Sequence, residues 1–188
     1  MRTAVTLVTG ATGSGKTTLI SRLLAKRPSH EHWAVLVNDF GKAALADAPG
    51  AIEGFVTVRD VAGCMCCTGQ VLLRTALVLL LRDIRPRRLL LEASAAAEPA
   101  GIARLLLDRG VADAVELEST VCVVSPRQIA DSRYLSQDAY RAQIAAADVI
   151  AVSGASTETE RIAAHAALNG LRSSPARVVD AYAPVSDL

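Results

Sequence analysis

Aromatic residues are scarce in this chain, whose 188 residues include two phenylalanines, three tyrosines and one tryptophan. Even so, 51% of the residues are hydrophobic. Alanine, leucine, valine and isoleucine must therefore build most of the core. A chain of this length suggests one domain with room for a sizeable core.

An excess of charge of one sign is also missing. The 20 basic and 19 acidic residues give a formal net charge of +1, and both signs are spread along the chain. Proteins that bind nucleic acid or an anionic membrane surface usually carry a strongly basic patch or stripe. We therefore expect neither nucleic acid nor a membrane among the partners.

Long apolar runs are absent as well. The N-terminal stretch MRTAVTLVTG has one basic residue and a short apolar run ending at Gly10. It lacks the longer apolar region and small-residue cleavage site of a secretory signal. The strongly apolar stretch at residues 76–81 is far too short to cross a bilayer. We expect a cytoplasmic protein, in which clustered cysteines more often bind metal or act in redox chemistry than form structural disulfides.

Alternating strand and helix patterns run along the chain. Short apolar runs predict strands, and apolar residues at helical spacing predict helices. This alternation predicts an α/β domain with three layers, in which helices flank a mainly parallel sheet. The polar, poorly periodic stretch Ser119–Gln137 is predicted to include a flexible surface loop. Strands are predicted at Ala4–Thr9, Trp33–Asn38, Phe55–Val58, Arg88–Glu92, Val121–Ser125, Val149–Val152 and Ala176–Asp180, and helices at Thr17–Lys26, Gln70–Asp83, Pro99–Arg109, Asp138–Ala147 and Glu158–Leu171.

The segment GATGSGKTT, residues 10–18, fits the phosphate-binding pattern G-x-x-x-x-G-K-[ST]. It lies between a predicted strand and a predicted helix, which is the setting that this motif requires. Its glycines let backbone N–H groups surround a phosphate, and the helix N-terminus adds its positive dipole end. Lys16 should reach the β- and γ-phosphates, and the Thr17 hydroxyl should bind Mg²⁺. The predicted nucleotide-binding residues are Gly10, Gly13, Ser14, Gly15, Lys16, Thr17 and Thr18.

The segment GCMCCTG gathers three of the four cysteines, Cys64, Cys66 and Cys67. Three thiolates can bind one soft ion, so the spacing suits Zn²⁺ or Cu(I) better than a hard cation. A zinc ion would need a fourth ligand to complete a tetrahedron. Two alternatives stay open: redox exchange through Cys64 and Cys67, and a structural role as buried thiols. Cys122, within TVCVV, is expected to be a core residue.

Four segments in this order resemble the CobW-type nucleotidases, which are P-loop GTPases that handle metals. They are also related to the nucleotide-binding proteins that mature hydrogenase and urease. The resemblance covers about residues 5–152, and its most specific part is G-C-x-C-C after an N-[DE]-F-G segment. It implies a single nucleotide-binding domain over residues 1–188, without the C-terminal domain that commonly follows in this family. The four segments are TGATGSGKTTLI, VLVNDFG, GCMCC and LLLEASAAAEP.

The resemblance also implies roles for two carboxylates. Asp39 stands where the family usually has glutamate, and it would lie in a switch loop near Mg²⁺. Glu92, at the tip of an apolar strand, can accept hydrogen bonds from metal-bound water or orient an attacking water. The implied catalytic residues are thus Lys16, Asp39 and Glu92, and the implied Mg²⁺ ligands are Thr17, Asp39 and Glu92.

Two positions depart from the family pattern. The family segment E-x-x-G reads Glu92-Ala93-Ser94-Ala95 in this chain, and alanine restricts the backbone more than glycine does. The guanine-reading N-K-x-D segment reads Ser153-Gly154-Ala155-Ser156. A site that loses a polar partner of its ligand loses much of its discrimination. We therefore expect GTP or another nucleoside triphosphate, without strong guanine selectivity.

Two main functional hypotheses follow. The first is a metallochaperone that uses a triphosphate and Mg²⁺ to control Zn²⁺ bound by Cys64, Cys66 and Cys67, for delivery to a client metalloprotein. A homodimer would suit such a switch protein. The second is a degenerate nucleotide-binding regulatory or interaction module with little hydrolysis. A small-molecule kinase is a third option, but it would leave the cysteines unexplained.

Overall fold

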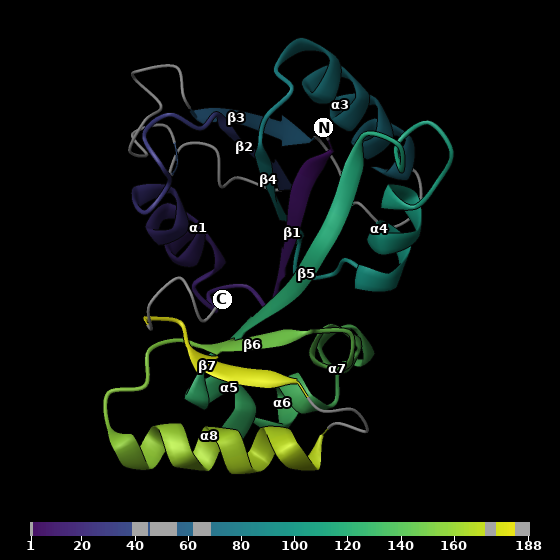
Figure 1. The fold of residues 1–188 in the computed structure, drawn as a ribbon. Coiled ribbons are helices and arrows are strands. Elements are labelled where there is room, and N and C mark those ends of the chain that lie inside the picture. Colours follow the sequence, from purple (N-terminus) through teal and green to yellow (C-terminus); the bar gives the residue numbers. More distant parts are fainter. Residues whose placement is uncertain (1, 39–44, 46–55, 62–68, 172–175, 183–188) are drawn as a thin grey trace.

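The computed structural model describes residues 2–38, 45, 56–61, 69–171 and 176–182. Within these residues, the strands form one parallel sheet of seven, in the order β3-β2-β4-β1-β5-β6-β7 (Figure 1). The apolar runs of the inner strands suit a parallel sheet, which is buried on both faces. The strands are β1 (Thr3–Thr9), β2 (Trp33–Asn38), β3 (Val56–Val61), β4 (Arg88–Glu92), β5 (Val115–Val124), β6 (Val149–Val152) and β7 (Arg177–Asp180).

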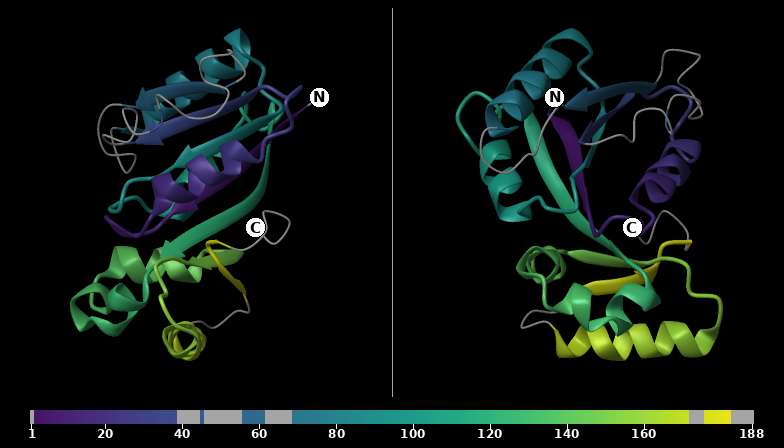
Figure 2. Two further views of the ribbon diagram at one scale, coloured as in Figure 1. Left: turned by 90° about the vertical axis from the view of Figure 1, so that its left-hand side faces the viewer. Right: turned by 180° about the vertical axis from the view of Figure 1, so that it is seen from behind.

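Helices cover both faces of the sheet (Figures 1 and 2). Helix α1 (Lys16–Ala25) packs Leu19, Ile20, Leu23 and Leu24 against one face, which includes Val8 of β1. Helices α3 (Gly69–Asp83) and α4 (Pro99–Leu106) pack against the other face, which includes Leu7. Leu7 and Val8 point to opposite faces because side chains alternate along a strand. The result is the predicted three-layered α/β arrangement.

A further group of helices covers the far end of the sheet. Helices α5 (Pro126–Ala130), α6 (Ser132–Leu135) and α7 (Asp138–Ala145) connect β5 to β6, and α8 (Glu158–Gly170) connects β6 to β7. In Figure 1, α5, α6 and α8 lie below β6, and α7 lies to its right. They share a core with Cys122 and Val124 of β5 and with Ile150 of β6. Cys122 is fully buried, as expected for a core residue.

The strand directions determine where a ligand site can form. All the carboxyl ends lie at one edge of the sheet, where open α/β sheets bind their ligands. The chain leaves β1 for the phosphate-binding segment at this edge. Asn38 ends β2, Val61 ends β3 and Glu92 ends β4 there as well.

Most predicted elements agree with the structure to within a few residues. The bounds of β2, β4 and β6 match the prediction, whereas β3 runs three residues past its predicted end at Val58, and Phe55 lies outside the described residues. The loop predicted within Ser119–Gln137 was wrong. After the predicted strand, which is the second half of β5, this stretch forms the two short helices α5 and α6.

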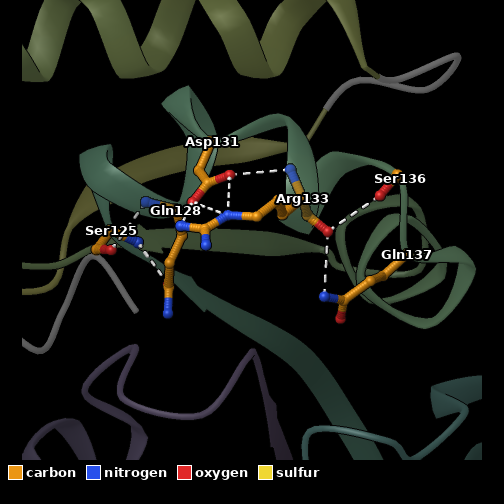
Figure 3. Close-up of polar contacts among 6 residues, drawn as sticks. All are labelled: Ser125, Gln128, Asp131, Arg133, Ser136 and Gln137. Carbon is orange, nitrogen blue, oxygen red and sulfur yellow. Dashed lines mark hydrogen bonds and ion pairs between the residues drawn. The ribbon is translucent and has the colours of Figure 1, made fainter.

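Caps explain why short helices form in that polar stretch. Ser125 and Gln128 form a reciprocal capping box at the start of α5, and Pro126 occupies the first turn. The Asp131 carboxylate accepts from the Arg133 N–H at the start of α6 and also pairs with the Arg133 guanidinium (Figure 3). Among the described residues, no helix is long and apolar enough to span a membrane.

Candidate nucleotide-binding site

The phosphate-binding segment turns sharply between β1 and α1. Gly10 has a φ of +135°, and a Cβ there would lie 2.3 Å from the carbonyl oxygen of Val123. Gly15 is the N-cap of α1, with a left-handed φ of +98°. Both positions require glycine, because other residues rarely adopt these angles and the first has no room for a side chain. The start of the loop at Gly10 is thus packed tightly against β5, whereas Thr12 and Gly13 are exposed.

Lys16 is the first residue of α1 and is buried. Its ammonium donates to the carbonyl oxygens of Gly10, at 2.9 Å, and Ala11, at 3.0 Å. These contacts hold a positive charge over the loop. The neighbouring Ser14 is also buried, whereas Thr18 is exposed on the first turn of the helix.

Glu92 meets the start of α1. The Thr17 hydroxyl donates to the Glu92 carboxylate, with Thr17 Oγ1 at 3.0 Å from Oε1 and 3.3 Å from Oε2. Only 6% of the Glu92 surface is exposed. Burial raises the pKa of Glu92, while the Thr17 hydroxyl and the Lys16 charge oppose this shift without cancelling it. A buried carboxylate therefore lies beside a hydroxyl and a lysine at the carboxyl edge of the sheet.

Two side chains from elsewhere in the chain hold the loop from behind. Gln128, whose side chain also caps α5, donates through Nε2 to the carbonyl oxygen of Thr12 at 3.0 Å (Figure 3 shows the Gln128 side chain). Ser153, at the end of β6, donates through its hydroxyl to the carbonyl oxygen of Ser14. Neither residue was predicted as part of the site. The S-x-x-Q capping pattern at Ser125 was the available signal for Gln128.

The turn after Glu92 is held in a similar way. The Ala97 N–H donates to the Ser94 carbonyl at 3.0 Å and closes the turn. The side chain of Gln143, on α7, donates through Nε2 to the carbonyl oxygens of Ala95 and Ala97 at 2.9 and 3.1 Å. Gln143 is fully buried. The connection between β5 and β6 thus contacts both the phosphate-binding loop and the turn that follows Glu92.

The segment after β6 carries no charged side chain before α8. Gly154 has a φ of +65°, and Ser156 is exposed. The Glu160 carboxylate accepts from the backbone N–H groups of Ser156 and Thr157, at 2.7 and 3.3 Å, as part of the α8 cap. The hydroxyl of Ser156 is the polar group that this segment offers at the position of the family's aspartate.

The remaining predicted site residues, Asp39, Cys64, Cys66 and Cys67, lie outside the described residues. Their neighbours in the chain are described: Asn38 ends β2, Val61 ends β3, and Gly69 begins α3. In the described part of the chain, no three histidine, cysteine, aspartate or glutamate residues are grouped so as to hold a metal ion. The metal-site prediction therefore stays a prediction.

Comparison with known proteins identifies the family. The model of the CobW/HypB/UreG nucleotide-binding domain matches residues 4–174. The chain belongs to this family. The predicted resemblance is thus confirmed over most of the sequence, and the family match includes the two positions where the chain departs from the usual motifs.

Relatives of this CobW/HypB/UreG chain include the zinc chaperone YeiR of Escherichia coli, 39% identical over 148 residues. That match covers 79% of this chain and 45% of the relative. The zinc-regulated GTPase metalloprotein activator 1 of Saccharomyces cerevisiae is 28% identical, over 68% of this chain and 32% of the relative. The chain therefore spans less than half the length of these two curated relatives.

Solved structures support the fold. The Zn(II)-bound YjiA GTPase of E. coli superposes with a TM-score of 0.64 at 22% identity, covering 89% of this chain and 54% of that one. The hydrogenase maturation factor HypB of Archaeoglobus fulgidus gives 0.63 at 15% identity, covering 95% and 80%. The P-loop α/β fold predicted for the chain is confirmed by these neighbours.

Proposed function

We propose that the chain binds a nucleoside triphosphate with Mg²⁺ and uses it to control a zinc ion held by Cys64, Cys66 and Cys67. The zinc ion would then pass to a client metalloprotein. The observation that carries this proposal is the contact between Thr17 and Glu92. It joins α1, the helix that follows the phosphate-binding loop, to the end of β4. A ligand bound at this contact would therefore act on both α1 and β4.

The groups at this contact suit Mg²⁺. Magnesium takes oxygen ligands, often one or two protein groups together with phosphate oxygens and water. Thr17 supplies a hydroxyl and Glu92 a carboxylate, and their oxygens are 3.0 Å apart. When bound, the ion would neutralise charge on the phosphates. Lys16 would bind the phosphates, and Glu92 would orient a water molecule.

Strand order supports a link between nucleotide and zinc. Four predicted site segments lie at the carboxyl ends of neighbouring strands. In the chain, the cysteine segment follows β3, Asp39 follows β2, Glu92 ends β4, and the phosphate-binding loop follows β1. These strands are neighbours in the sheet, in the order β3-β2-β4-β1. Adjacent strands are about 4.8 Å apart, so these ends span only about 15 Å. Binding at one segment can therefore change the affinity at another, and this coupling is reciprocal. The name of the relative YeiR, a zinc chaperone, agrees with zinc as the cargo.

The coupling is tested by measuring Zn²⁺ affinity with and without Mg²⁺ and a non-hydrolysable GTP analogue. We expect the two affinities to differ by about 5- to 150-fold, the usual range of such coupling. Lys16→Ala should remove the difference, and a Cys64/Cys66/Cys67 triple serine variant should remove zinc binding. Equal affinities in the wild type would contradict nucleotide control of zinc.

Turnover separates this function from the alternative of an inert regulatory module, which Ala95 and the Ser153–Ser156 segment motivate. We expect Mg²⁺-dependent phosphate release from both GTP and ATP. Lys16→Ala should lower the rate by more than about 100-fold, because one donor to developing charge typically contributes 10²–10³ in rate. Tight nucleotide binding without phosphate release would favour the inert module.

A further inference from the structure

Gln143 lies deep in the protein but touches the edge of the proposed site. It comes from α7, 48 positions along the chain from Ala95, and none of its surface is exposed. Both hydrogens of its amide group are used, one for each carbonyl oxygen of Ala95 and Ala97. Both carbonyls belong to the turn that follows Glu92. The Glu92 carboxylate accepts a hydrogen bond from the Thr17 hydroxyl.

The ends of this turn are fixed by other contacts. The Ala93 N–H donates to the Val8 carbonyl at 2.9 Å, which continues the pairing of β4 with β1. Ala97 is buried in the core beneath α4. Between them, Ser94 and Ala95 are partly exposed and Ala96 is exposed. Gln143 therefore acts on the partly exposed part of the turn at Ala95 and on its buried end at Ala97.

The amide group of Gln143 has opposing effects on stability. Gln143 Oε1 is buried and has no hydrogen-bond partner in the described part of the chain, which is costly. Its Nε2 donates to the buried carbonyl of Ala97, which would lose this donor in a leucine variant. The second bond, to Ala95, reaches the partly exposed part of the turn and fixes the backbone there. A test of this residue must therefore compare turnover with stability.

We propose that Gln143 is a positioning residue for nucleotide turnover: by fixing the Ala95 and Ala97 carbonyls, it sets the direction of the backbone amides and the carboxylate next to the phosphates. The role rests on the proposed function. Through Gln143, the helices between β5 and β6 are joined to the turn after Glu92, as Gln128 joins them to the phosphate-binding loop.

The test compares turnover with binding in Gln143→Leu. Phosphate release should fall about 10- to 100-fold, because small errors in placing reacting groups have effects of this size. The affinity for GDP should stay within about threefold, since the phosphate-binding loop is untouched. The ratio of affinities for a non-hydrolysable triphosphate and GDP should fall towards one.

Two controls on the same helix measure purely structural effects. Tyr140→Phe removes a buried hydroxyl that has no partner in the described residues, and Ile144→Val trims the core one residue after Gln143. Both should keep turnover within about twofold of the wild type, although Ile144→Val lowers the melting temperature. If Ile144→Val slows turnover as much as Gln143→Leu, the positioning role is overturned.

The pH dependence of turnover in Gln143→Glu is a second test. It depends on whether the side chain can donate a hydrogen bond. An ionised carboxylate cannot donate to the two carbonyls, whereas a protonated carboxyl donates one hydrogen bond. The turnover of this variant, relative to the wild type at each pH, should therefore rise between about pH 8 and pH 6. A constant ratio would count against the proposal.

The outcomes separate this proposal from the function on which it rests. Unchanged turnover and affinity ratio in Gln143→Leu would overturn the positioning role alone. If the wild type binds nucleotide without turnover, the ratio of affinities for the non-hydrolysable triphosphate and GDP still tests the positioning role of Gln143. A wild-type protein that binds no nucleotide would overturn the proposed function, and the role of Gln143 with it.

Discussion

At the phosphate end of the site, the loop carbonyls hold the Lys16 ammonium and the Glu92 carboxylate accepts from the Thr17 hydroxyl. At the base end, Ser153 still braces the loop through the Ser14 carbonyl, but Gly154 and Ser156 carry no charge that reads a base. Support of the loop and recognition of the base are thus separate tasks, and this chain keeps the first without the usual residues for the second.

The largest effect should come from the phosphate end. Glu92→Gln should slow phosphate release by more than about 100-fold if the carboxylate orients the attacking water. The same variant, free of nucleotide and Mg²⁺, should melt at a higher temperature than the wild type at neutral pH. It removes a buried charge while keeping a hydrogen-bond acceptor for Thr17.

The sign of the pH dependence follows from the raised pKa of Glu92. Folding favours the protonated carboxyl, so its stabilising contribution is fully present below the ordinary pKa and is lost as pH rises through the raised value. Calorimetry should show a melting-temperature difference between variant and wild type that grows over this window. A difference independent of pH would show that Glu92 is not the cause.

A smaller effect is expected when the base end is given a carboxylate. Ser156→Asp should increase the preference for GTP over ATP by about tenfold, because each hydrogen bond to a charged group contributes about 1.5–3 kcal/mol and Glu160 nearby opposes the new charge. Competition binding of the two triphosphates measures the ratio. An equal change for both would show that Ser156 does not face the base.

The smallest effect concerns the support of the loop. Ser153→Ala should weaken binding of GTP and ATP alike by about three- to tenfold, since it removes one neutral hydrogen bond to the loop. Ser29→Ala, which removes an exposed hydroxyl before β2, at the opposite edge of the sheet, is the matched control and should leave affinity unchanged. A loss confined to one nucleotide would contradict the division between support and recognition.

The sequence predicted the fold because the inner strands of a parallel sheet are continuous apolar runs. Trp33–Asn38, Arg88–Glu92 and Val149–Val152 were recognised from this feature alone. The first half of β5 was missed because Glu116 and Glu118 interrupt its apolar residues. That half is ordered by pairing with β1, which starts at Thr3 opposite Val115.

The site was predictable where one segment contains the chemistry. The loop motif located Lys16 and Thr17 without any tertiary information. Gln143 and Ser153 act through contacts with residues 48 and 139 positions away, so nothing in their local sequence identifies them. Glu92 lies between these cases, since its position at the end of an apolar strand was visible but its contact with Thr17 was not.

The central position of β1 has a consequence for synthesis of the protein. This strand is synthesised before the other described strands, yet Thr9 contacts Val121, which is 112 positions later. At about 5–20 residues per second, the strand waits about 6 to 22 s for β5. During that time an apolar, β-branched segment that later carries the phosphate-binding loop lacks at least one of its two partner strands, and such segments are prone to aggregate. Chaperones that hold nascent chains should therefore matter more for the yield of this domain than for its final stability.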